Sequence, residues 1–247
     1  MDKEGMLNDI FVSKGSDHGY LEVTAQFSAE RDLKISWIRA GTLIDFWISD
    51  YLEDASKEVL ESLADTMYKR ISSFSREPYS DLLLDYVTDP DFISNNRKTY
   101  LTRVNGISKS PVGRHHDLSK SYMRLVDSEL VEYDPKVVLR WAPQRESKFV
   151  GHSSVLMKTI CINRMMDCKY IPEEVIDYAL FSQLSFIDRE FGDDPKDKIE
   201  DVKRTMTEFP DYKRLDKAIS DIGMTLWGEV SPRTNTLSHG NDGDVDL

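Results

Sequence analysis

Hydrophobic and polar residues alternate through much of the first 50 residues, and this is the period of a half-buried β-strand. The alternation falls into three stretches, at residues 20–27, 33–37 and 43–48. β-branched and aromatic side chains are frequent in these stretches, and polar or glycine-containing turns separate them. The pattern predicts three short strands arranged as a β-meander, which we assign to an N-terminal extension over residues 1–50.

The hydrophobic period changes to that of an amphipathic helix after Ser56, which stands where a helix N-cap is expected. The pattern continues as far as Ile71. Similar reasoning predicts short helices or turns at 79–87 and 89–99, helices at 117–132, 171–190, 198–208 and 211–222, and strands at 136–142, 148–151 and 155–163. Residues 229–247 are acidic and poor in apolar side chains, so we expect a disordered acidic tail there.

The composition is that of a globular protein, with 247 residues of which 40% are hydrophobic. The formal net charge of −12 repels phosphate backbones, so nucleic acid is not an expected partner. No apolar run approaches the roughly 18 residues that a membrane-spanning helix needs, so no membrane association is expected. Two cysteines and no leader-like segment favour a cytoplasmic location.

The histidines lack the spacing of a local zinc motif. Five are present, at positions 18, 115, 116, 152 and 239. None are four apart, as on one helix face, or two apart, as on one strand face. His115 and His116 are adjacent, so on a helix their side chains would diverge by about 100°.

Five fragments, taken in order, are similar to one family of metallopeptidases. They are DASKEVLESLADTMYKRI, GRHHDLSKSYMRL, VVLRWAPQRESKFVGHSSVLMKTICINRMMD, IPEEVIDYALFSQLSF and EDVKRTMTEFPDY. Together they resemble the SprT-like zinc metallopeptidases, particularly the bacterial and archaeal members, over residues 43–224. The resemblance implies a zincin-like α+β fold for residues 51–228, in which helices pack on a small, mainly antiparallel sheet.

The same resemblance implies that the catalytic motif is degenerate. In the family, the long helix after the third strand carries His-Glu-x-x-His, and the frame places its two histidine ligands at Ser182 and Phe186 and its general base at Gln183. A serine hydroxyl is a poor zinc ligand, a phenyl ring has no lone pair, and an amide cannot accept the proton of the attacking water. We therefore expect no metal and no cofactor, and a catalytically inactive protein that binds a peptide or protein partner or has a regulatory role.

Three residues are candidates for the cleft that the resemblance implies, namely Trp141, His152 and Cys161. Residues 151–162 include the edge strand on which an extended peptide would add as a further strand. One alternative is a structural role for each residue. A second is an enzyme without zinc that uses Cys161, His152 or the pair His115 and His116. A third is a divergent active metallopeptidase. The sequence specifies neither the partner nor the oligomeric state.

Overall fold

A computed structural model describes residues 2–73, 77–104, 106–142, 148–187, 195–226 and 242–246. The chain divides into two compact units, each considered by itself below. Unit 1 comprises residues 1–103 and 232–247, and unit 2 comprises residues 104–231. No helix among the described residues is long and apolar enough to cross a membrane.

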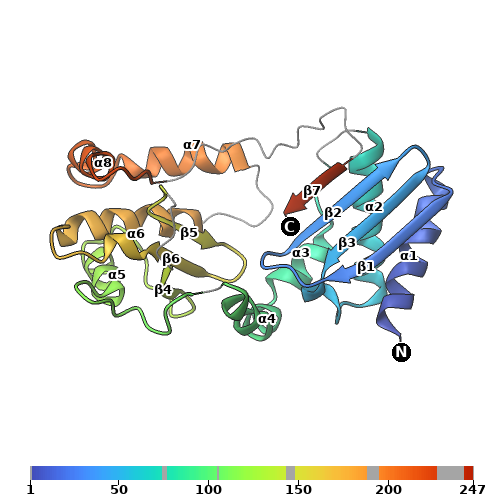
Figure 1. The fold of residues 1–247 in the computed structure, drawn as a ribbon, viewed down its shortest axis with the longest axis horizontal. Helices are drawn as coiled ribbons and strands as arrows, with labels where there is room; N and C mark the ends of the chain where they lie inside the picture. The colour runs from blue at the N-terminus through green and yellow to red at the C-terminus, as the bar shows by residue number, and fades with distance from the viewer. Residues whose placement is uncertain are drawn as a thin grey trace. The chain divides into compact units, whose positions relative to one another are not determined.

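Unit 1 is a mixed four-stranded sheet with helices. Its elements are α1 (Lys3–Asp17), β1 (Glu22–Ser28), β2 (Lys34–Ala40), β3 (Leu43–Ser49), the 3-10 helix η1 (Asp50–Leu52), α2 (Lys57–Ser73), α3 (Asp81–Thr88), α4 (Pro90–Arg103) and β7 (Asp242–Asp246). The strand order is β1-β3-β2-β7, with β3 parallel to β1 and antiparallel to β2 (Figure 1).

The three predicted strands are confirmed, but the β-meander is wrong. In a meander β1 would pair with β2, whereas β3 lies between them and pairs with both. Gly41, with φ of 65°, makes the tight turn that joins β2 to β3. Alternation fixes which side chains share a face of a strand, but it does not specify the neighbouring strand, so the sequence pattern could not distinguish the two orders.

The core of unit 1 lies between the sheet and the first two helices. Phe46 on β3 packs against Phe11 on α1, with ring centroids 4.8 Å apart, and against Tyr68 on α2, at 5.4 Å. The Tyr68 hydroxyl also donates a hydrogen bond to the Phe11 carbonyl oxygen (2.8 Å). The sequence predicts a domain boundary between residues 50 and 51. That boundary would separate β1–β3 from helix α2, which packs on them, whereas the compact unit continues to Arg103.

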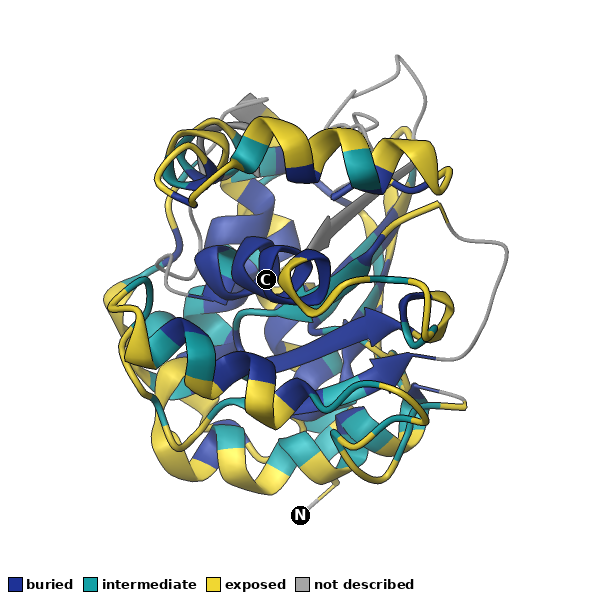
Figure 2. Ribbon diagram, turned by 90° about the vertical axis from the view of Figure 1, so that its left-hand side faces the viewer, coloured by how far each residue is buried: buried dark blue, intermediate teal, exposed yellow. Residues whose placement is uncertain are grey.

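Unit 2 is a three-stranded mixed sheet with helices. Its elements are α5 (Leu118–Asp127), β4 (Val138–Ala142), β5 (Gly151–Ser154), β6 (Thr159–Asn163), the 3-10 helix η2 (Arg164–Met166), α6 (Glu173–Ile187), α7 (Pro195–Met206) and α8 (Tyr212–Asp221). The central strand β6 is parallel to β4 and antiparallel to β5. Helix α6 is buried over nearly its whole length (Figure 2).

The predicted elements of unit 2 are present with altered bounds. The helix expected over 117–132 ends at Asp127, and Glu129 then adopts a left-handed conformation with φ of 59°. The strand expected at 148–151 lies at Gly151–Ser154, and the strand expected at 155–163 is shortened to Thr159–Asn163, because residues 155–158 form a turn in which Lys158 has φ of 45°. Such backbone angles interrupt a helix or strand locally and are not visible in hydrophobic periodicity.

The α+β class is confirmed in a coarser form than expected, as small mixed sheets packed by helices. Each sheet contains one parallel pair beside its antiparallel pairing, so both sheets are mixed. The predicted disordered tail is wrong for residues 242–246, which form β7. These residues form a strand because they pair with the edge of β2, and the composition of the segment does not indicate that pairing. The rest of the expected tail, 229–241 and 247, lies outside the described residues.

Candidate functional site

The three positions of the degenerate motif lie on the buried helix α6. Ser182 and Gln183 are buried. The Ser182 hydroxyl donates to the Ala179 carbonyl oxygen (2.8 Å), and Gln183 Nε2 donates to the Leu226 carbonyl oxygen (3.2 Å). Phe186 is half-buried and packs against the hydrophobic core. The two polar side chains thus form hydrogen bonds inside unit 2 and offer almost no exposed surface to a substrate.

The register of the second sheet sorts the three cleft candidates. His152 on β5 pairs directly with Cys161 on β6, so these two share a face of the sheet. Trp141 on β4 pairs with Ile162 and belongs to the opposite face. The structure therefore brings His152 and Cys161 together and separates Trp141 from them.

Burial restricts the chemistry of these candidates. Cys161 has no exposed surface, and a nucleophilic thiol has to be reached by its substrate. Trp141 is buried and its Nε1 donates to the Pro111 carbonyl oxygen (2.8 Å), which is a packing role. Among the described residues, no three His, Cys, Asp or Glu side chains lie close enough together to hold a metal ion.

The segment containing His115 and His116 is bound to Asp167. The carboxylate of Asp167 accepts hydrogen bonds from the backbone N–H groups of His115 (2.8 Å) and His116 (3.0 Å) and from that of Arg114. Burial by itself raises the pKa of Asp167, but these donors outweigh it and the pKa falls below its ordinary value. An internal carboxylate thus occupies the amides that could otherwise receive an anionic ligand.

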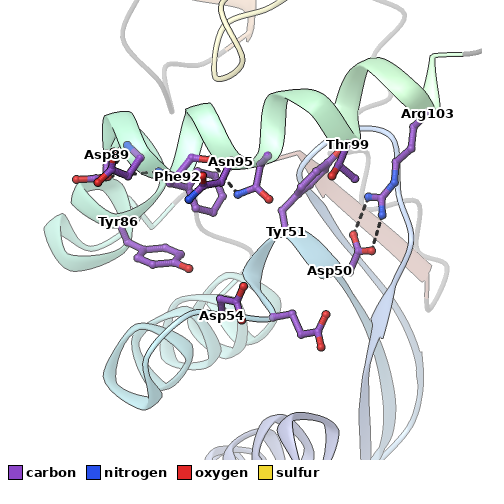
Figure 3. A pocket seen from close by; sticks show the side chains of 12 residues that line it. Asp50, Tyr51, Asp54, Tyr86, Asp89, Phe92, Asn95, Thr99 and Arg103 are labelled. Carbon is purple, nitrogen blue, oxygen red and sulfur yellow. Dashed lines mark hydrogen bonds and ion pairs between the residues drawn. The ribbon is translucent and has the colours of Figure 1, made fainter.

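A cavity of about 440 Å³ in unit 1 is the strongest candidate for a ligand site. Its walls come from η1 and the two acidic residues that follow it, from α3, and from α4 (Figure 3). The lining residues are Asp50, Tyr51, Glu53, Asp54, Tyr86, Asp89, Asp91, Phe92, Asn95, Asn96, Thr99 and Arg103. This volume lies within the range of small-ligand sites, roughly 300–1,000 Å³.

Helix α4 supplies one continuous wall of the cavity. Phe92, Asn96, Thr99 and Arg103 are spaced four, three and four residues apart, so they lie along one helix face. Asp89 fixes the start of this helix, because its carboxylate accepts hydrogen bonds from the backbone N–H groups of Asp91 (2.8 Å) and Phe92 (3.3 Å). The amide, hydroxyl and guanidinium groups of this face are thereby presented to the cavity on a rigid element.

The lining is strongly acidic. Five carboxylates and a single guanidinium line the cavity, and that guanidinium is already paired. Arg103 Nη1 donates to Asp50 Oδ1 (2.7 Å), Nη2 donates to the other oxygen, and the hydrogen bond with Asp50 raises the pKa of Arg103. Outside the lining, Lys3 pairs with Asp54 and lies 3.8 Å from a Glu53 oxygen. An incoming cation would therefore meet a surplus of negative charge.

Aromatic rings form the apolar part of the lining. Tyr86 on α3 and Phe92 on α4 meet edge to face, with centroids 5.1 Å apart, and Tyr51 lies under the guanidinium of Arg103 at 4.9 Å. Burial raises the pKa of Tyr86, and the nearby Asp54 carboxylate adds to that rise. The pKa of Tyr51 is also raised by burial. Both phenols stay neutral at physiological pH, and the ring face of Tyr51 is already occupied by the Arg103 guanidinium.

Comparisons of the chain with protein-family models, with curated proteins and with solved structures return no match.

Sequence reasoning did not single out any residue of the cavity. Its lining comes from residues 50–54, from Tyr86 and from residues 89–103, which are separate in the sequence. One signal was present, since the α4 segment carries polar side chains on the face that follows Phe92 where a surface helix would normally show a single apolar stripe. That pattern indicates that the polar face of the helix lines a site, although it does not identify the other segments that line it.

Proposed function

We propose that this chain is a non-catalytic binding protein, and that its ligand is a peptide or protein segment with a lysine or arginine side chain that enters the cavity of unit 1. The observation that carries the proposal is the lining itself, where five carboxylates and three aromatic rings surround a space of about 440 Å³.

The shape of a basic side chain suits this lining. An alkyl stem packs against apolar rings such as Tyr86 and Phe92, while its charged head is attracted to carboxylates and ring faces. A bare divalent cation suits it less well, because calcium and magnesium need several oxygen ligands converging on one point. The described carboxylates do not converge in that way.

A non-catalytic role is supported by unit 2. We propose, as the resemblance over residues 51–228 implies, a degenerate SprT-like domain whose motif helix and cleft strand lie in unit 2. Its buried helix α6 follows the third strand, β6, and β5 lies at the edge of the sheet, which is the arrangement that the resemblance implies for the motif helix and the cleft strand. The internal hydrogen bonds of Ser182 and Gln183 support the loss of the metal site.

The proposal is tested by isothermal titration of the full chain with an acetylated, amidated peptide of alternating alanine and lysine. The variant Glu53→Gln, Asp54→Asn, Asp91→Asn removes three of the five lining carboxylates and keeps the Asp50–Arg103 pair and the Asp89 cap. We expect this variant to bind the peptide about tenfold more weakly at low ionic strength, because each exposed charge pair adds a modest increment to affinity.

A matched control carries the same change in net charge away from the cavity. Asp127→Asn, Glu132→Gln, Glu208→Gln alters three exposed acidic residues that do not line it. This control should bind the peptide like the unaltered chain. If both triple variants lose affinity equally, attraction is due to overall charge and the cavity is not the site. If neither loses affinity, the proposal is likewise wrong.

A further inference from the structure

The two edges of the unit 1 sheet are occupied in different ways. At the β1 edge, side chains of α1 accept the outward backbone hydrogens: Asn8 Oδ1 accepts from the Ala25 N–H (3.0 Å), and the Glu4 carboxylate accepts from the Phe27 N–H (3.3 Å). These acceptors belong to a helix packed on the same sheet. The β1 edge is therefore closed to a further strand.

The β2 edge is covered by β7, a segment from the far end of the sequence. The two strands run antiparallel over five positions, with Lys34 opposite Asp246, Ile35 opposite Val245, Ser36 opposite Asp244, Trp37 opposite Gly243, and Ile38 opposite Asp242 (Figure 1). The whole of unit 2 lies between β2 and β7 in the sequence. No short hairpin holds them together, so β7 can leave the edge without disturbing a neighbouring turn.

The composition of β7 is poorly suited to a permanent strand. Its sequence is Asp-Gly-Asp-Val-Asp, and aspartate and glycine are the residues that strands disfavour. The alternation nevertheless matches its partner, since Gly243 and Val245 stand opposite Trp37 and Ile35, the buried positions of β2. Acidic residues stand opposite the remaining positions, which include Lys34. Backbone pairing, which any extended segment can supply, must contribute much of the attachment.

We propose that the β2 edge is an acceptor site for an extended acidic segment of a partner protein, and that residues 242–246 are a built-in competitor for it. The partner segment carries acidic residues at alternate positions and small or β-branched residues between them, as β7 does. This site is separate from the cavity, whose proposed ligand is basic. Each proposal can therefore be confirmed or refuted without affecting the other.

The test uses the full chain and a fluorescein-labelled peptide with the sequence of residues 240–247, GNDGDVDL. In the variant Asp244→Pro, Val245→Pro, the tethered segment loses at least one donor of the ladder, because neighbouring residues of a strand direct their N–H groups to opposite edges. A tethered competitor acts at an effective concentration in the millimolar range. We therefore expect the apparent dissociation constant of the peptide to be at least about tenfold lower for the variant than for the unaltered chain, and a peptide with the same two prolines to bind neither.

Hydrogen exchange provides a second measurement on the same proteins. Amides of residues 34–38 should exchange faster in the proline variant than in the unaltered chain, and the GNDGDVDL peptide should restore their protection. Equal peptide affinity for the two proteins, or no binding to the variant, would overturn the proposal. Unchanged exchange of residues 34–38 in the variant would overturn it too, because β7 would then not be what covers the edge.

Discussion

Arg124 on α5 and Asp177 on α6 form an ion pair in unit 2 whose carboxylate is nearly buried, and replacing each residue in turn tests the packing there. Nε of Arg124 donates to Asp177 Oδ2 and Nη2 donates to Oδ1, both at 2.7 Å. Nη2 also donates to the Ser121 hydroxyl (3.0 Å), and Nη1 lies 3.1 Å from a Glu173 oxygen. The Asp177 side chain is 12% exposed, while that of Arg124 is 37% exposed.

This difference in exposure predicts unequal effects of the two substitutions. Arg124→Ala leaves a nearly buried carboxylate without its partner, and breaking a fully buried pair costs about 3–5 kcal/mol. Because this pair is only partly enclosed, we expect about 2–3 kcal/mol. Asp177→Ala leaves a guanidinium that can reach water and still has Glu173, so we expect a loss of about 1 kcal/mol. The double variant should be no less stable than Arg124→Ala, which gives a coupling energy of about 1 kcal/mol or more.

The assay is urea denaturation monitored by pulsed hydrogen exchange. Exchange is measured on peptides cut from unit 2 after labelling, so the free energy of unfolding refers to that unit. Arg124→Lys serves as a control that keeps the charge and loses the bidentate geometry, and it should fall between the unaltered chain and Arg124→Ala. Additive effects of the two alanine substitutions within about 0.3 kcal/mol would refute the reasoning, as would a larger loss for Asp177→Ala than for Arg124→Ala.

Two further predictions concern stability. The lowered pKa of Asp167 means that its contribution is fully present above the ordinary aspartate pKa of about 3.9 and is lost as the pH falls through the folded-state value, so Asp167→Ala should flatten the acid limb of the stability profile of unit 2. In α1, Gly15→Ala should lower the melting temperature, because its new methyl group would lie 2.7 Å from the Tyr68 hydroxyl. Gly5→Ala meets only the side chain of Asp2 and should leave the melting temperature unchanged or raise it; equal shifts for the two alanine variants would contradict this account.

The sequence predicted most elements of the fold but not their pairing. Strands β1, β2 and β3 and the helix at residues 57–73 follow from hydrophobic period, because a two-residue or 3.6-residue repeat is a local property. Helix α1 was missed, since its glycines at 5 and 15 and its weak apolar stripe hide the helical repeat. The order of β1, β3 and β2 depends on contacts between separate segments, which no local pattern records.

The sequence indicated candidate residues in unit 2 but none of the residues that line the cavity of unit 1. The pairing of His152 with Cys161 lies within the region that the sequence indicated, and the register shows why Trp141 does not join them. The acidic cavity was not anticipated, because its lining is assembled from three segments of unit 1 that have no shared motif. A cavity arises from tertiary packing, so its residues become recognisable as a group only in the folded chain.

The most direct test of the central claim compares two peptides, one with lysine and one with norleucine, which lacks the ammonium group, at the same positions. Each is titrated into the full chain while the ring-proton resonances of Tyr86 and Phe92, which line the cavity, are followed by NMR. The account predicts saturable shifts of both rings with the lysine peptide and none with the norleucine peptide. Equal shifts with both peptides, or saturable binding of the lysine peptide that leaves both rings unshifted, would contradict it.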